Sequence, residues 1–188
     1  MPTTVPSALI IVDLQKAIDD PRWGDDRNNP DAEANIARLL ARWRELRWPV
    51  FHVRHESRDP RSTYRRSPFK YDVLEGERVI EKSTNSAFIG TTLERELRAA
   101  GIERVVIAGV ITNNSVEATA RMSGNLGFRT IVVSDATATF GRRDYDGVWR
   151  TAAEVHAMSL ANLDGEYAEI ATTESLLTNV PDARIKGV

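Results

Sequence analysis

Three polar side chains follow predicted strands and could act together on one bound substrate. Asp13 follows an apolar run, Lys82 ends a short strand, and Ser115 lies where a helix begins. In parallel α/β sheets, ligands bind outside the carboxyl ends of the strands. A carboxylate there can take a proton, a hydroxyl can attack, and backbone N–H groups at a helix start can hold an oxyanion. These are the groups that nucleophilic acyl transfer requires. The other residues expected at this edge of the sheet are Arg54, His55 and Asp135.

Each of the three side chains also has an ordinary structural interpretation. A strand-end aspartate such as Asp13 often caps the turn that follows it. Lys82 could be solvated, as most lysines are. Ser115 could cap its helix, which is what serine at a helix start usually does. Residue types alone therefore leave acyl transfer as a hypothesis.

The elements that must position these residues alternate along the chain. Strands are predicted at 8–13, 50–54, 79–82, 104–109, 130–134 and near 168–172. Helices are predicted at 30–46 after an Asn29-Pro30 cap, between 91 and 101 and from 114 to about 127 with capping boxes, and around 148–162. Alternating strands and helices predict a parallel sheet with helices on both faces. We expect a single three-layer α/β/α domain over residues 1–188, with a central, mainly parallel six-stranded sheet.

Composition limits the classes of partner. The chain has 188 residues, a net charge of -2 and no cysteine. Such a charge gives no general attraction to nucleic acid or to an anionic membrane, and we expect neither partner. Without cysteine there is no disulfide and no thiolate metal site. The first cation is Lys16, and the apolar run 8–12 is too short for a signal segment or a membrane span. We therefore expect a cytoplasmic protein.

Several loops are expected to determine which substrate is bound. No Gly-x-Gly-x-x-Gly, no phosphate-binding loop and no Gly-x-Ser-x-Gly elbow occurs at the expected place. The polar, arginine-rich segment 56–78 is longer than most irregular loops, so it is either a solvated surface or a lid. Together with 19–28 and 139–147 it should shape a site for a small molecule. The candidate substrate-binding residues are Trp23, His55, Tyr64, Arg65 and Phe88.

Three segments resemble the isochorismatase-like hydrolases, which are also called cysteine hydrolases. The similarity runs from residue 8 to about 173, and it is carried by residues 8–15, 81–88 and 109–121. These segments are similar to the first strand with its aspartate, to the lysine segment, and to the nucleophile loop with its helix. The resemblance implies that Asp13 is the general base and that residue 115 is the nucleophile. It implies that Lys82 holds Asp13 ionised or holds the nucleophile's charge in place. It also implies homo-oligomers.

The resemblance further implies a cis peptide bond between Val110 and Ile111. In the family this bond turns the Ile111 N–H toward the N–H of residue 115, and the two groups form the oxyanion hole. Nicotinamidase-type members also carry an Asp-x-His plus His metal cluster. Residues 55–60 have no such pattern. We therefore expect neither a metal nor another cofactor.

This chain departs from the family at the nucleophile, because Ser115 occupies the cysteine position. A hydroxyl is not pre-ionised as a thiol is, so Asp13 alone would have to remove its proton during attack. Three explanations remain open. Serine could be an introduced Cys→Ser change, it could be natural with slower or altered chemistry, or the protein could cleave a vinyl ether by acid catalysis without any nucleophile.

These features predict a metal-independent hydrolase that cleaves the C–N bond of a small linear amide, ureido or carbamoyl compound through Asp13, Lys82 and Ser115. One alternative is an isochorismate-type vinyl-ether hydrolase that uses no nucleophile. A second alternative is a small-molecule binding or scaffold protein that kept the fold without turnover.

Overall fold

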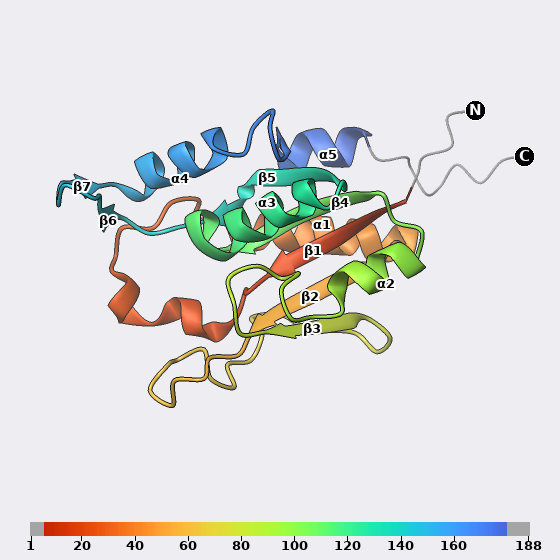
Figure 1. Cartoon of the computed structure of the whole chain (residues 1–188), viewed down its shortest axis with the longest axis horizontal. Coiled ribbons are helices and arrows are strands. Elements are labelled where there is room, and N and C mark those ends of the chain that lie inside the picture. The colour runs from red at the N-terminus through yellow and green to blue at the C-terminus, as the bar shows by residue number, and fades with distance from the viewer. Residues whose placement is uncertain (1–5, 180–188) are drawn as a thin grey trace, which may run out of the picture.

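A six-stranded parallel sheet forms the centre of the computed structural model, which describes residues 6–179 (Figure 1). Its strands lie in the order β3-β2-β1-β4-β5-β8, and every neighbouring pair is parallel. They are β1 (Ser7–Val12), β2 (Val50–His55), β3 (Arg78–Lys82), β4 (Arg104–Val110), β5 (Arg129–Ala138) and β8 (Glu169–Ala171). The predicted α/β class with a six-stranded parallel sheet is confirmed.

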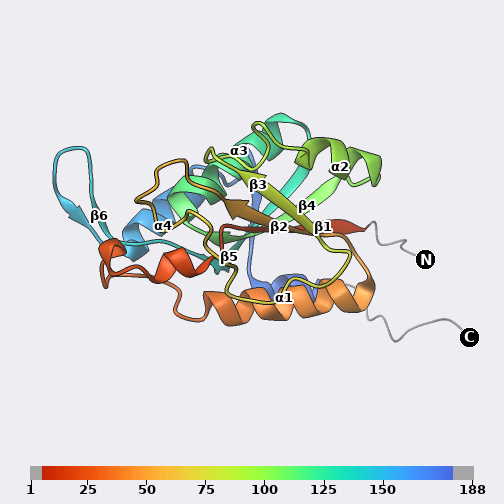
Figure 2. The ribbon, with the colours of Figure 1, turned by 90° about the horizontal axis from the view of Figure 1, so that it is seen from below.

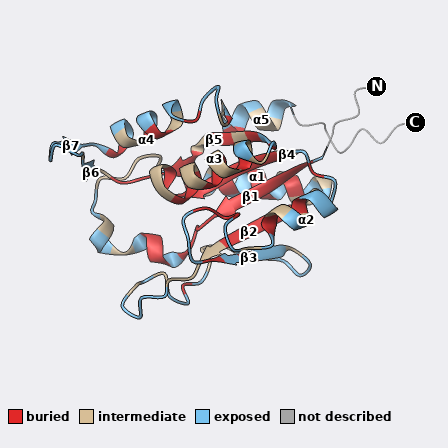
Figure 3. Cartoon of the chain, in the orientation of Figure 1, coloured by how far each residue is buried: buried red, intermediate tan, exposed pale blue. Residues whose placement is uncertain are grey.

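Helices cover both faces of this sheet (Figure 2). They are α1 (Ala32–Leu46), α2 (Leu93–Ala99), α3 (Glu117–Asn125), α4 (Ala152–Ala161) and α5 (Thr173–Asn179). Apolar residues of α1 and α5 pack in one cluster with one face of β1 and β4, whereas α2 and α3 pack in a second cluster on the opposite face. Residues Ser7–Val12 of β1 are buried throughout (Figure 3). Burial on both faces explains why this strand is a continuous apolar run.

The ends of β1 and β4 approach each other closely at the edge where the candidate residues lie. Gly109 of β4 has φ 124, and a Cβ there would lie 2.1 Å from the Val12 carbonyl oxygen. Only glycine fits such an approach without a backbone shift. Asp13 comes directly after Val12, the last residue of β1, and has φ 52. Its N–H donates to the Val53 carbonyl at 2.9 Å. Left-handed backbone is uncommon for residues other than glycine and turns the chain sharply out of the strand.

The predicted starts of two helices are wrong. Helix α1 begins at Ala32 rather than with Pro30 at its first position. The side chain of Asn29 does not cap this helix; its amide donates to the carbonyls of Ser134 and Thr137, at 2.7 Å each. Helix α2 begins after Thr92 and has no capping box. Asn29 is of a type that suits a helix cap, but its side chain makes tertiary hydrogen bonds instead.

The helix predicted from residue 114 also begins differently. Residues Thr112–Val116 form a π-helical turn, η3, and α3 continues from Glu117 without a capping box. The Glu117 carboxylate instead accepts hydrogen bonds from Arg121 and Ser159. This turn carries Ser115 at the end of β4, so its geometry determines where the hydroxyl points.

Additional elements complete the fold. Two 3-10 turns follow β1, η1 (Lys16–Asp19) and η2 (Pro21–Trp23), and a hairpin of β6 (Arg142–Arg143) and β7 (Trp149–Arg150) precedes α4. Helix α4 begins at Ala152, later than predicted, and α5 is an element that sequence reasoning missed. Within residues 6–179, no helix has the length and apolar character that crossing a membrane requires.

Candidate active site

Asp13, Lys82 and Ser115 meet at the carboxyl ends of the central strands. The Lys82 ammonium donates to Asp13 Oδ2 at 2.7 Å and to Ser115 Oγ at 3.2 Å. All three residues are buried, with 3%, 3% and 7% of their surface exposed. Strands β1 and β3 end here, and the turn after β4 lies beside them, because parallel strands bring their carboxyl ends to one edge. The structure therefore brings the three predicted residues into one cluster.

Burial shifts the proton affinities within this cluster. Loss of solvent raises the pKa of Asp13 above its ordinary value, and the charge and hydrogen bond of Lys82 only partly oppose this rise. Loss of solvent likewise lowers the pKa of Lys82, against the effect of Asp13. A carboxylate with a raised pKa is a stronger base than an exposed aspartate. The base that serine attack requires is therefore strengthened by its burial.

One carboxylate oxygen of this cluster is left without a protein partner. Asp13 Oδ1 is buried and accepts no hydrogen bond from the described residues. Lys82 also donates to the Thr84 carbonyl at 3.1 Å and lies 3.4 Å from His55 Nδ1. Burial, followed by the charge of Lys82, lowers the pKa of His55. A neutral imidazole with an unprotonated Nδ1 can accept a hydrogen bond from this ammonium, while Oδ1 of Asp13 stays open to a substrate or nucleophile proton.

The backbone around Ser115 has the unusual peptide geometry that the family resemblance implied. The bond between Val110 and Ile111 is cis. The π-helical turn begins immediately after it and includes Ser115. The N–H groups of Ile111 and Ser115 remain the proposed oxyanion donors.

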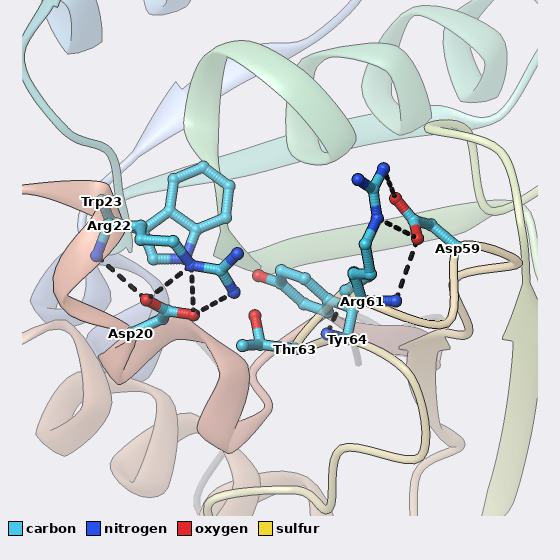
Figure 4. Close-up of a pocket in the computed structure, with 8 residues that line it drawn as sticks. Asp20, Arg22, Trp23, Asp59, Arg61, Thr63 and Tyr64 are labelled. Carbon is cyan, nitrogen blue, oxygen red and sulfur yellow. Dashed lines mark hydrogen bonds and ion pairs between the residues drawn. The ribbon is translucent and has the colours of Figure 1, made fainter.

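The long loop and the turns after β1 line a pocket of about 490 Å³ (Figure 4). Its lining residues are Asp20, Arg22, Trp23, Asp59, Arg61, Ser62, Thr63 and Tyr64. The Tyr64 ring contacts the His55 ring edge-on at 5.5 Å between centroids, and Trp23 contacts Tyr64 at 6.3 Å. Because His55 lies beside Lys82, Tyr64 and His55 connect the pocket to the buried cluster.

The candidate substrate-binding residues divide into two groups. Trp23, Tyr64 and His55 form one chain of ring contacts leading from the pocket toward Lys82. Phe88 lies apart from this chain in the core, where its ring stacks on Phe128 at 5.9 Å. Arg65 lines a separate hollow beside Lys16 and Pro68. The structure thus does not bring Phe88 and Arg65 into the pocket that Trp23 and Tyr64 line.

Asp135, expected at the same edge, has a structural role instead. It lies within β5, which extends further than predicted. Its carboxylate accepts hydrogen bonds from the backbone N–H and the hydroxyl of Thr173, both at 2.8 Å. These bonds fix the start of α5, the helix that sequence reasoning missed.

Sequence reasoning also missed Gln15, which ties the long loop to the site. The Gln15 amide donates to the carbonyls of His55 and Ser67 at 3.1 and 3.0 Å, and its oxygen accepts from the His55 N–H at 2.8 Å. One side chain thereby anchors both ends of a segment of about a dozen residues that contains Tyr64. The only available sequence signal was a glutamine two residues after Asp13.

The other histidines do not join the candidate site. His52 is buried, with Nδ1 3.0 Å from the Tyr71 hydroxyl and Nε2 2.8 Å from Glu77. His156 lies 3.0 Å from the Thr112 hydroxyl. No group of three or more His, Cys, Asp or Glu side chains in the described part of the chain is arranged to hold a metal ion.

Comparison with known proteins identifies the family of the chain. The Isochorismatase domain model matches residues 7–175. The chain is 46% identical to the uncharacterized isochorismatase family protein YrdC of Bacillus subtilis, with 92% of this chain and 95% of YrdC covered. It is 28% identical to the maleamate amidohydrolase of Pseudomonas putida, with 90% and 84% covered.

A solved structure extends the agreement to the whole fold. It is a crystal structure of an isochorismatase-family protein from Chromobacterium violaceum, 49% identical, with a TM-score of 0.89. The match covers 95% of this chain and 97% of the other. The matching family model, the sequence identity and the shared fold together show that this chain belongs to the isochorismatase family of hydrolases.

Proposed function

We propose that the protein hydrolyses the C–N bond of a small linear amide, ureido or carbamoyl compound. The observation that carries this proposal is the position of the Lys82 ammonium between Asp13 Oδ2, at 2.7 Å, and Ser115 Oγ, at 3.2 Å. A base, a buried cation and a nucleophilic atom in contact form the arrangement that covalent acyl transfer uses. The maleamate amidohydrolase among the relatives is named for an amide-cleaving activity, which supports this class of reaction.

The proposed reaction has two covalent steps. Asp13 takes the hydroxyl proton as Ser115 Oγ bonds to the carbonyl carbon, and the carbonyl oxygen becomes an oxyanion facing the N–H groups of Ile111 and Ser115. The C–N bond then breaks, and the proton on Asp13 passes to the leaving nitrogen, which departs as ammonia or an amine. In the second step Asp13 takes a proton from water, the resulting hydroxide attacks the acyl carbon, and Ser115 Oγ leaves with the proton.

Lys82 serves this proposed reaction without accepting the nucleophile's proton. Its positive charge stabilises negative charge on the attacking atom at 3.2 Å and holds Asp13 in place. The open Oδ1 of Asp13 is available for the proton in flight. The same protein residues complete both steps, so the proposal requires no metal and no cofactor.

One observation favours a second candidate function. The nucleophile position carries a hydroxyl, and no residue of the chain is a cysteine. Vinyl-ether cleavage of the isochorismate type would need Asp13 as a proton donor and no nucleophile, and the raised pKa of Asp13 suits an acid as well as a base. A binding protein without turnover is the third possibility.

One panel of substrates distinguishes amide hydrolysis, vinyl-ether cleavage and binding without turnover. We expect ammonia release from small linear amides or ureido acids, measured with a coupled assay. Pyruvate release from isochorismate, with no ammonia from the amides, would favour the vinyl-ether reaction. Saturable binding without either product would favour a binding protein. Asp13→Asn is the matched control, because it should abolish both reactions while leaving the pocket lining intact.

A further inference from the structure

Two identical tripeptides face each other across the pocket beside the site. Asp20-Pro-Arg22 follows η1, and Asp59-Pro-Arg61 lies in the long loop 56–78. In each, the arginine N–H donates to the aspartate Oδ1 at 2.9 Å. The guanidinium Nε and Nη2 then donate to the same carboxylate, as Figure 4 shows. Each turn is therefore a rigid unit whose guanidinium is held by its own aspartate.

Both arginines keep hydrogen-bond donors that are free for a ligand, whereas the two carboxylates of this pocket are paired with them. Hydrogen bonds from Arg22 hold the pKa of Asp20 down at about 2, and those from Arg61 lower the pKa of Asp59, so both carboxylates are ionised and engaged. Nη1 of each arginine has no partner among the described residues. Burial, followed by the charge of Asp13, raises the pKa of Tyr64, so its hydroxyl remains a proton donor.

Aromatic rings give the pocket a rigid inner wall. The Trp23 indole stacks on Phe140 at 5.7 Å between centroids, and its Nε1 donates to the Ala17 carbonyl at 3.1 Å. Tyr64 packs edge-on between Trp23 and His55. A volume of about 490 Å³ lies within the range of small-molecule sites. The ring contacts of this wall run through Tyr64 and His55 to Lys82, which places the pocket near the buried cluster.

We propose that the two Asp-Pro-Arg turns and the Tyr64 hydroxyl bind a carboxylate of the substrate. This inference rests on the proposed amide hydrolysis and narrows its substrates to small amides or ureido compounds that also carry a carboxylate. A planar anion matches the donor edges of guanidinium groups, whose orientation is already determined by Asp20 and Asp59. A cationic substrate would meet two guanidinium groups and carboxylates that are already paired with them, so cationic amides should bind more weakly.

A binding experiment on the unaltered Ser115 protein tests this subsite without requiring turnover. The probes are succinamate, which has an amide and a carboxylate, and butyramide, which has the same chain length and no carboxylate. We expect succinamate to bind at least tenfold more tightly than butyramide by calorimetry, and to change the tryptophan fluorescence of the protein, since Trp23 lines the pocket. Equal binding of the two probes would overturn the proposal.

Charge-removing variants locate the carboxylate. Arg22→Gln and Arg61→Gln should each weaken succinamate binding roughly tenfold, the usual scale for a charge-assisted contact, and leave butyramide unchanged. The side chains are 67% and 87% exposed, so neither change disturbs the core. Arg58→Gln is the matched control, since Arg58 is exposed on the same loop and outside the pocket lining. Unchanged succinamate affinity in both variants would contradict the assignment.

Turnover by a Ser115→Cys form separates this inference from the proposed function. If both are right, Arg22→Gln and Arg61→Gln should raise KM for succinamate and leave kcat nearly unchanged. Arginine-dependent binding of succinamate without hydrolysis of any amide would refute the proposed function and support the subsite. Hydrolysis of butyramide as efficiently as succinamate would support the function and refute the subsite.

Discussion

Replacing Ser115 by cysteine tests how the site activates its nucleophile. A free thiol of pKa ~8.5 is only about 3% ionised at pH 7. In this site the Lys82 ammonium lies 3.2 Å from the attacking atom, and the π-helical turn begins a helical segment. A nearby ammonium and a helix start commonly lower a thiol pKa by roughly 2 units, which makes about three-quarters of it thiolate.

A serine hydroxyl gains no comparable ionised fraction from the same neighbours. We therefore expect Ser115→Cys to raise kcat/KM for a small amide by roughly 10³-fold or more, which is at least about 4 kcal/mol of transition-state stabilisation. Ammonia release at several amide concentrations measures this directly. Asp13→Asn should abolish hydrolysis with either residue at position 115, because residue 13 can then neither protonate the leaving nitrogen nor take a proton from the attacking water.

Two comparisons make this prediction refutable. Ser123→Cys is the control, because it places a thiol at the far end of α3. Ser123 is buried, and its hydroxyl is hydrogen bonded to that of Thr130. This variant should not increase hydrolysis. Lys82→Ala should impair the cysteine form strongly, since the charge that stabilises the thiolate is lost. If Ser115→Cys is no faster and Ser115→Ala is fully active, residue 115 does not attack, and vinyl-ether cleavage becomes the better hypothesis.

Further predictions concern pH, stability, metals and assembly. The proposed reaction needs Asp13 ionised and Lys82 protonated. Burial raises the pKa of Asp13 above 3.8 and lowers the pKa of Lys82 below 10.5, so kcat/KM plotted against pH should be bell-shaped, with both limbs inside those limits. An acid limb at pH 3.8 would contradict the role of burial. Glu77 is partly buried, yet hydrogen bonds from Arg44, the Leu74 N–H and His52 hold its pKa to about 2. Because this pKa is depressed, Glu77→Gln should cost about 1–2 kcal/mol in urea unfolding at pH 7, and the difference should vanish as pH falls from 4.5 toward 2; a pH-independent difference would refute the linkage. Dialysis against EDTA should leave activity unchanged, whereas a loss restored by zinc or manganese would reveal a metal site. Light scattering at micromolar concentration should give a multiple of 21.0 kDa, and a monomer mass would refute the predicted homo-oligomer.

The sheet and the three-residue cluster were predictable for the same physical reason. Strands buried on both faces are continuous apolar runs, and β1 is such a run. The carboxyl ends of parallel strands share one edge, so Asp13 and Lys82 were expected on the same edge of the sheet. Their 2.7 Å contact and full burial were not predictable, because both depend on how β2, β3 and the following turns pack.

Helix starts and loops were less predictable because distant partners decide them. Asn29 suits a helix cap, yet its amide bonds to two carbonyls more than 100 residues away. The first part of the long loop is held by Gln15, whose side chain donates hydrogen bonds to the carbonyls of His55 and Ser67. Nothing local in the sequence shows that pairing, so the two Asp-Pro-Arg turns could be read as turns and not as opposite walls of one pocket.

Mass spectrometry of the Ser115→Cys form tests the central claim most directly. During turnover of a small amide, quenched samples should contain enzyme heavier by the acyl group, carried on the peptide that includes residue 115. Combining Ser115→Cys with Asp13→Asn should prevent the adduct from forming, because no proton then passes from residue 13 to the leaving nitrogen and the C–N bond does not break. Steady release of ammonia with no acyl adduct at residue 115, at any quench time, would contradict nucleophilic catalysis by this residue.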